Sequence, residues 1–329
     1  MRRRDFMMML GATAGACPFT GRAQQPANVP RVGWIWNGRS AGDPTEAAGF
    51  RQGLKELGYI EGQNVVVDYR FGEGTAADRL AELAAELIRL RPDVLVALGT
   101  PALRAVENVT TTIPVVQMSG DPVGLGVATS LARPGGNITG VSMTDVLVGK
   151  RVELLKEALP RATRIGLMFS PANNPTGLNS RALAEAEKVA GRLGLTIRPF
   201  PVERGEDLDA AIHTVARAGI DGVDIEAFDP FTSFPRETGE LLLKYRLPAA
   251  SELRRITESG GLLSYGPNLF DAVRRLAYFV DRILKGTKPA DLPIEQASTL
   301  ELVVNMKTAA SLDLTIPSML LARADEIIE

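Results

Sequence analysis

The stretch VVQMSGDPVG, residues 115–124, joins a strand to an abrupt polar stop. Residues 113–118 form a mainly apolar run that is short enough for a strand buried in a parallel sheet. Ser119-Gly120-Asp121-Pro122 then replaces the apolar side chains with small and polar groups. Such an ending is either an ordinary turn or the edge of a site, and repetition of the pattern along the chain would favour a site.

Strand-like and helix-like segments alternate on both sides of this stretch. The segments with strand character are 31–36, 65–69, 94–98, 113–118, 138–143, 164–169, 196–202, 222–227, 261–265 and 300–304. Helices are expected at 45–57, 76–90, a short segment from Pro101, 125–132, 147–159, 175–193, 206–218, 236–245 and 268–285. Alternation of this kind predicts parallel sheets covered by helices on both faces. Because one open sheet rarely holds so many strands, we expect an α/β fold with two doubly wound parallel-sheet lobes.

Nearly every expected strand ends in small, polar or aromatic residues. Ligands of open parallel sheets bind beyond the carboxyl ends of the strands, so these ends supply the candidate ligand-binding residues. The candidates are Trp36, Asn37, Gly99, Thr100, Ser119, Asp121, Ser142, Ser170, Asn173, Asn174, Asp229, Phe231 and Tyr265. Helix capping explains many of the polar residues but none of the aromatic ones. Helix N-termini beside aromatic rings suit a small polar ligand with a planar or carboxylate part.

The common catalytic and cofactor motifs are absent or incomplete. His213, the only histidine, lies within an expected helix and away from every strand end. Asp121 and Asp229 remain candidates for an acid–base pair, but each is followed by proline, which is typical of a turn. Gly124-Leu125-Gly126 begins like a dinucleotide-binding motif, but Thr129 stands in place of the third glycine. We therefore expect a binding protein without catalytic residues, cofactor or metal ion.

Composition excludes one further class of protein. The chain has 329 residues, of which 45% are hydrophobic, enough for the cores of about two domains. Its formal net charge is −2. Because a nucleic-acid-binding protein needs a basic face, we expect no nucleic-acid partner.

Residues 1–23 have the order of an export signal. Three arginines precede a short apolar segment, and small residues precede a cleavage site near Ala23. The run RRDFM, residues 3–7, also resembles a twin-arginine motif, and the apolar part is too short to span a bilayer. Cys17, the only cysteine, lacks the leucine that lipoprotein signals carry three positions earlier, which argues against a lipid anchor. We expect a periplasmic protein that is peripheral to the membrane.

Several motifs resemble, in order, those of one protein family. They are FRQGLKELGY (50–59), EGQN (61–64), RPDV (91–94), GTP (99–101), DPV (121–123), LARPGGNITG (131–140) and SYGP (264–267). The family is that of ABC-transporter substrate-binding proteins, which includes tryptophan-type binding proteins. The resemblance extends from about Arg31 to the end of the chain.

This resemblance implies a type I periplasmic-binding fold, in which a cleft separates two lobes. We place lobe one at 31–140 plus 262–300 and lobe two at 141–261 plus 301–329, with hinge crossings near Ser142, Leu262 and Leu300. The implied function is an exported receptor that captures a small polar ligand, such as an amino acid or an aromatic compound, and delivers it to an ABC permease. A ligand-sensing module for a membrane signalling protein is the alternative, and an enzyme is a third.

Two segments depart from the family pattern. Asp224 and Glu226 interrupt the strand that precedes Asp229, where the family has apolar residues. Ala249-Ala250-Ser251-Glu252 stands where a Tyr-Glu segment is expected. Both segments fall on the lobe-two side of the expected cleft, so they bear on the ligand more than on the fold.

Overall fold

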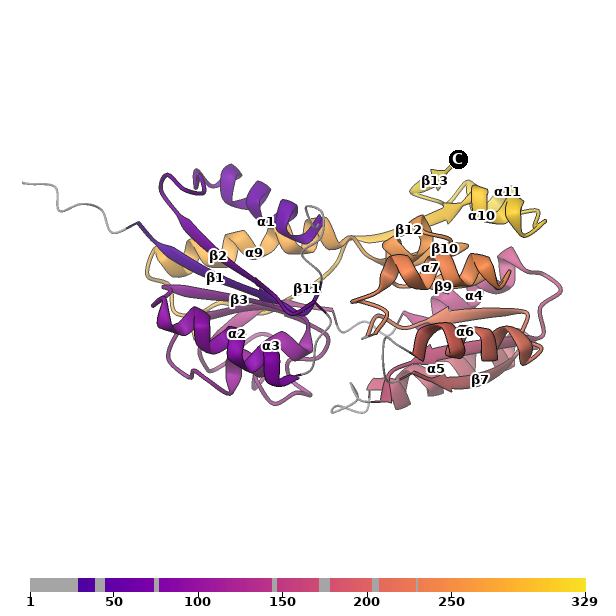
Figure 1. The fold of residues 1–329 in the computed structure, drawn as a ribbon, viewed down its shortest axis with the longest axis horizontal. Helices are drawn as coiled ribbons and strands as arrows, with labels where there is room; N and C mark the ends of the chain where they lie inside the picture. Colours follow the sequence, from indigo (N-terminus) through magenta and orange to yellow (C-terminus); the bar gives the residue numbers. More distant parts are fainter. Residues whose placement is uncertain are drawn as a thin grey trace, which may run out of the picture.

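Two β-sheets form the centres of two lobes that lie side by side (Figure 1). The computed structural model describes residues 29–38, 45–73, 77–143, 147–171, 178–202, 207–228 and 230–329. In spatial order, the first sheet contains β11 (Glu295–Gln296), β5 (Ile138–Ser142), β4 (Val115–Ser119), β3 (Val94–Leu98), β1 (Arg31–Trp36) and β2 (Val66–Phe71). The second contains β13 (Glu326–Ile328), β12 (Leu300–Asn305), β10 (Leu263–Pro267), β9 (Ala249–Ser251), β8 (Gly222–Ile225), β6 (Arg164–Phe169) and β7 (Thr196–Pro201). The expected α/β class with two doubly wound lobes is confirmed.

Lobe one, the first sheet with its helices, is covered on both faces. Helices α1 (Thr45–Glu56) and α9 (Leu269–Leu284) cover one face, and α2 (Ala77–Arg89) and α3 (Thr100–Glu107) cover the other (Figure 1). Because side chains alternate along a strand, Trp34 of β1 packs under α1 and α9, whereas its neighbour Ile35 packs under α2 and α3. Gly53 lets α1 approach α9 closely, since a Cβ there would lie 2.4 Å from the carbonyl oxygen of Arg274.

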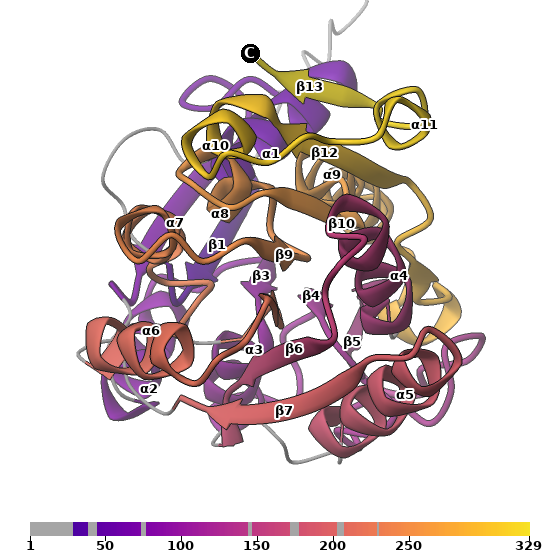
Figure 2. The ribbon, with the colours of Figure 1, turned by 90° about the vertical axis from the view of Figure 1, so that its right-hand side faces the viewer.

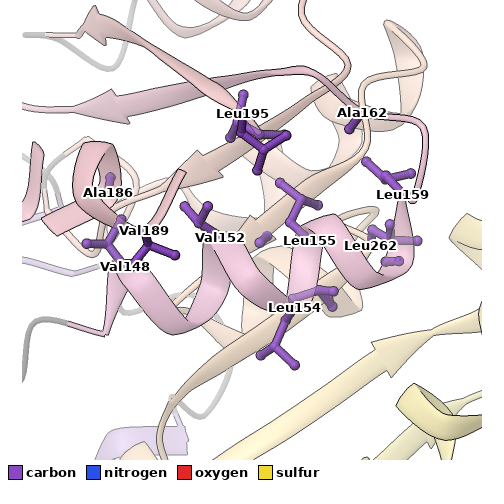
Figure 3. Close-up of a cluster of buried hydrophobic side chains, with 14 of the residues drawn as sticks. Val148, Val152, Leu154, Leu155, Leu159, Ala162, Ala186, Val189, Leu195 and Leu262 are labelled. Carbon is purple, nitrogen blue, oxygen red and sulfur yellow. The ribbon is translucent and has the colours of Figure 1, made fainter. Parts of the chain in front are cut away.

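Lobe two, the second sheet with its helices, has the same layered construction (Figure 2). One face carries α4 (Val148–Ala158), α5 (Leu178–Arg192), α10 (Met306–Ser311) and α11 (Ser318–Leu321). The opposite face carries α6 (Leu208–Arg217), α7 (Pro235–Lys244) and α8 (Arg254–Glu258). Figure 3 shows Val148 of α4 against Ala186 and Val189 of α5 within the first of these cores. Val148, Val152 and Leu155 lie on one side of α4 and form its apolar stripe, and burial of this stripe determines which side of the helix faces the sheet.

The chain crosses between the lobes three times. The crossings lie between β5 and α4, between β10 and α9, and between β11 and β12. The expectation that residues from 262 onward belong to lobe one is wrong for β10. This strand pairs in parallel with β9 and antiparallel with β12, and Leu263 is buried in the core of lobe two. The crossing expected near Leu262 therefore lies after Pro267.

Local elements also differ from the expectations in places. Residues 125–132 form turns rather than a helix, and Gly126 has a φ of 77° that a continuous helix does not contain. The short elements β9, α8, β11 and β13 were not predicted, because segments of two to five residues carry too few positions to show a period. None of the helices in the described ranges is both long and apolar enough to cross a bilayer.

Candidate functional site

A cavity of about 450 Å³ lies between the lobes. Lobe one contributes the carboxyl ends of β1, β3 and β4 and the first turns of α1 and α3. Lobe two contributes the segments that follow β8 and β9, the beginning of α7, and α8. Residues 267–270 at the second crossing also line the cavity. Strand ends from both sheets therefore meet at one place, as ligand sites in open parallel sheets do.

Five of the candidate residues line this cavity, and all five belong to lobe one. They are Trp36, Asn37, Gly99, Thr100 and Ser119. They were identified because each follows or ends a parallel strand, and neighbouring parallel strands bring their carboxyl ends to the same edge. Whether they contact the ligand stays a prediction.

The start of α3 and the end of β4 form a polar corner of the cavity. The backbone N–H of Gly99 donates to the carbonyl oxygen of Met118 at 2.7 Å, which places the first turn of α3 beside Ser119. Gly99 has a φ of 80°, a backbone conformation that favours glycine, and no side chain caps α3. Ser119 Oγ is buried and has no hydrogen-bond partner among the described residues. The corner therefore offers unsatisfied hydrogen-bonding groups next to the positive end of a helix dipole.

The two tryptophans of β1 have different environments. Trp34 is fully buried, with its ring centroid 5.0 Å from that of Phe50. Trp36 is half-buried, lines the cavity and meets Phe71 edge-on at 6.3 Å. The backbone of Gly38 packs closely against the Trp36 ring, because a Cβ on Gly38 would lie only 2.2 Å from a ring atom. Trp36 thus offers a supported aromatic surface to the cavity.

The lobe-two wall contains a buried charge cluster. Arg151 of α4 is fully buried, and its Nε and Nη2 atoms donate to the two carboxylate oxygens of Asp224 at 2.7 and 3.0 Å. Nη2 also donates to Glu226, and Nη1 lies 3.7 Å from Glu252 Oε2. Burial opposes the charge on Arg151, but the nearby carboxylates of Asp224 and Glu226 raise its pKa overall. Glu226 and Glu252 reach the cavity, whereas Asp224 lies behind them.

Sequence reasoning noticed the acidic members of this cluster but missed Arg151. Asp224, Glu226 and Glu252 stood out as departures from a family pattern. The signal for Arg151 was also present, because it lies between Val148 and Val152 on the buried stripe of α4. An arginine on the apolar face of a helix indicates a buried carboxylate partner.

Two ion pairs join the lobes beside the cavity. Arg181 of α5 in lobe two binds Asp121 of lobe one at 2.7 Å, and Arg255 of α8 binds Glu46 of α1 at 2.9 Å. Asp121 also accepts a hydrogen bond from the backbone of Gly124 at 2.8 Å. Asp121 is therefore a turn residue and a contact between lobes, and it does not line the cavity. Burial raises the pKa of Glu46, although Arg255 opposes the shift.

The remaining candidates lie away from the cavity or outside the described residues. Ser142 Oγ donates to the carbonyl oxygen of Gly120 at 2.9 Å, and Ser170 is buried. Phe231 is fully buried in the core of lobe two, and Tyr265 packs against that lobe's other core. These four were expected at the cleft because they follow strands, but their side chains turn into the lobe. Asn173, Asn174 and Asp229 lie outside the described residues.

No metal site accompanies the cavity in the part of the chain that the structure describes. No group of three or more His, Cys, Asp or Glu side chains there is arranged to hold a metal ion. His213 lies on α6 with its ring centroid 5.2 Å from that of Tyr245, and it does not line the cavity.

Comparison with known proteins assigns this architecture to a family. The sequence profile described as "ABC transporter substrate binding protein" matches residues 42–328. The chain belongs to the ABC transporter substrate-binding protein family. The family resemblance predicted from the sequence motifs is thereby confirmed.

Three relatives of this substrate-binding protein are informative. A conserved domain protein from Vibrio cholerae superimposes with a TM-score of 0.82 at 28% identity, covering 91% of this chain and 99% of its own. The ABC domain in complex with L-Trp from Streptococcus pneumonia gives the same TM-score and coverage at 26% identity. A tyrosine-binding protein of Clostridioides difficile is 23% identical over 269 residues, covering 81% of this chain and 76% of the relative. The protein thus has the type I periplasmic-binding fold and is a small-molecule-binding protein of the ABC transporter substrate-binding family.

Proposed function

We propose that this substrate-binding protein captures an aromatic amino acid between its lobes and delivers it to the permease of an ABC transporter. The observation that carries the proposal is the composition of the interlobe cavity. Its walls combine aromatic surface, the uncapped start of a helix and carboxylates. The L-Trp complex and the tyrosine-binding protein among its relatives support the same ligand class.

The corner at Gly99, Thr100 and Ser119 suits the carboxylate of an amino acid. The first-turn N–H groups of a helix lack intrahelical acceptors, and the helix dipole favours a negative charge there. Ser119 Oγ lacks a partner among the residues described, so a ligand carboxylate would satisfy its O–H. Neither arginine of the cavity wall is required for this contact, because both already pair with glutamates.

Aromatic surface comes from both lobes. Trp36 lines the cavity from lobe one and Phe228 lines it from lobe two, each half-buried. A planar ligand ring would bury apolar area against these side chains, and aromatic contacts add to that gain. A ligand held by both lobes also stabilises their closed arrangement, because it binds that arrangement more tightly than an open one.

Titration of the purified protein with L-phenylalanine tests this function. We expect calorimetry to show binding and Trp36 fluorescence to change, because the ring lies at the cavity. Trp36→Phe should remove most of the fluorescence change, whereas Trp34→Phe, a matched change in the core, should keep it. Trp36→Ala should weaken binding by roughly 1–3 kcal/mol.

Three results would count against the proposal. They are failure of phenylalanine, tyrosine and tryptophan to bind a folded protein, full retention of affinity in Trp36→Ala, and recovery of a chemically altered ligand. The last result would indicate an enzyme, because a transport receptor releases its ligand unchanged.

Delivery to a permease further requires that the protein work outside the cytoplasm. The expected export signal at 1–23 lies outside the described residues, and it supports a periplasmic location. Cell fractionation should recover a shortened chain that begins near Gln24 from the periplasm. Full-length protein confined to the cytosol would contradict both the location and the role in uptake.

A further inference from the structure

The second crossing between the lobes consists of a single residue, Asn268. Strand β10 of lobe two ends at Pro267, and helix α9 of lobe one begins at Leu269. So short a crossing confines the backbone rotation that accompanies lobe closure to very few dihedral angles. The contacts of Asn268 therefore influence how the two lobes are placed relative to each other.

Asn268 caps the helix that it precedes. Its side-chain Oδ1 accepts a hydrogen bond from the backbone N–H of Asp271 at 3.0 Å, and its carbonyl oxygen accepts one from Ala272 at 3.0 Å. These bonds attach Asn268 to α9, so the residue moves with lobe one. Because Oδ1 must face the N–H of Asp271, they also determine the direction in which the amide nitrogen points.

The amide nitrogen of this cap reaches a residue of the other lobe. Asn268 Nδ2 donates to Glu301 Oε2 at 3.3 Å, and Glu301 lies in β12, where it is paired with Gly266 of β10. Arg254 of α8 donates to the second carboxylate oxygen of Glu301 at 2.7 Å and so holds this carboxylate to lobe two. The hydrogen bond between Asn268 and Glu301 therefore joins the lobes at the hinge itself.

This hydrogen bond lies on the side of the hinge that faces the interlobe cavity. Asn268 and Glu301 both line that cavity. Opening of the cleft separates the lobes on this side, so it would lengthen the bond, as it would lengthen the two ion pairs that join the lobes beside the cavity. A hydrogen bond to a charged acceptor is also stronger than one between neutral groups.

We propose that Asn268 is a positioning residue that holds the lobes in their closed arrangement through its hydrogen bond to Glu301. Trp36 lines the cavity from lobe one and Phe228 from lobe two, so a ligand meets both walls only when the lobes are closed. The apparent affinity falls in proportion to the closed fraction of the protein. This effect on affinity rests on the proposed function, whereas the effect on the lobe arrangement does not.

Asn268→Asp separates the two roles of this side chain. A carboxylate caps a helix as well as an amide does, so α9 should be preserved. The substitution removes the N–H donor and places a second carboxylate opposite Glu301, which repels it. Addition of Glu301→Gln moves the amide to the other partner, where it donates to the new carboxylate and still accepts from Arg254. The double variant should therefore restore the link that the single variant lacks.

Distances between two spin labels report the lobe arrangement without any ligand. A chain that begins near Gln24 contains no cysteine, so label sites can be introduced at Glu82 of α2 and Lys188 of α5, which are both exposed. We expect Asn268→Asp to shift the ligand-free distances toward longer values. The double variant should reverse this shift.

Calorimetry with L-phenylalanine measures the consequence for binding. Asn268→Asp should bind roughly 5- to 20-fold more weakly than the wild type, and the double variant should recover most of this loss. Asn64→Asp is the matched control, because Asn64 Oδ1 accepts from the N–H of Ile60 and its Nδ2 donates to the carbonyl oxygen of Gly58, all within lobe one. This control should change neither the label distances nor the affinity.

The outcomes separate this inference from the proposed function. Unchanged label distances in Asn268→Asp would overturn the role of Asn268, and so would a shift that the double variant does not reverse. Failure of L-phenylalanine to bind the wild type would contradict the proposed function, while the ligand-free distances would still decide the role of Asn268. If Asn268→Asp does not fold, Asn268→Ser takes its place, because serine keeps a capping oxygen and lacks the amide donor.

Discussion

Replacement of Arg151 by methionine is expected to lower the free energy of unfolding by about 3–5 kcal/mol. Methionine is unbranched and uncharged, so the substitution leaves the buried carboxylates of Asp224 and Glu226 without their guanidinium partner. Unpaired buried charges are among the few single changes with effects of this size. Urea unfolding followed by circular dichroism would measure the loss. Arg236→Met is the matched control, because this exposed arginine pairs with Glu240 on the surface and should change stability by less than about 0.5 kcal/mol.

The loss in Arg151→Met should depend on pH in a defined direction. In the wild type, the pKa of Glu226 is about 8 in the folded protein and 4.5 without the fold. The folded state binds more protons between these values, so the contribution of Glu226 is fully present below pH 4.5 and is lost as the pH rises toward 8. Removal of Arg151 withdraws a group that lowers this pKa, so the variant should be most damaged at pH 8 and least at pH 5. A loss below about 1 kcal/mol at pH 8 would contradict the buried cluster as described.

Phe231→Ala is expected to lower the free energy of unfolding by about 3–5 kcal/mol without weakening ligand binding by the folded protein. Phe231 is fully buried among Met168, Leu208 and other residues of the lobe-two core, so alanine would leave a cavity there. The side chain does not line the interlobe cavity. Thermal or urea unfolding measures the first effect, and calorimetry with L-phenylalanine measures the second.

Phe228→Ala is the reciprocal control for Phe231→Ala, because Phe228 lies three residues earlier in the same turn. Phe228 is half-buried and lines the interlobe cavity. Its truncation should weaken L-phenylalanine binding by roughly 1–3 kcal/mol and cost much less stability than Phe231→Ala. If the two variants exchanged these effects, the orientation of the segment after β8 would be wrong.

The sequence predicted the architecture and the lobe-one half of the cavity for one physical reason. Parallel strands at the centre of a sheet have a recognisable apolar run, and their carboxyl ends lie at one edge, so Trp36, Thr100 and Ser119 could be grouped from local patterns alone. Side-chain direction beyond a strand end has no such rule. Phe231 and Tyr265 were expected at strand ends as Trp36 and Asn37 were, yet Phe231 is buried in one core of lobe two, and Tyr265 lies within β10 and packs against the other core.

Long-range pairing was the other limit. Arg151 meets Asp224 across 73 residues of sequence, and no local period connects a helix residue to a strand so distant. The assignment of β10 failed for the same reason. Its residues 263–267 have the character of a strand, but the choice between two sheets depends on pairing with β9 and β12.

The three crossings between the lobes have a consequence for the order in which the protein is made. Helix α9 and strand β11 belong to lobe one, although five strands of lobe two, β6 to β10, precede them in the sequence. During synthesis, α9 is therefore missing from the face of the first sheet that it shares with α1 until residue 284 has been added. Lobe two likewise lacks its edge strands β12 and β13 until residue 328. Separate domains usually fold one after another from the N-terminus during synthesis. Here the core of lobe one stays incomplete while most of lobe two is synthesised, and both cores are completed only near the end of the chain.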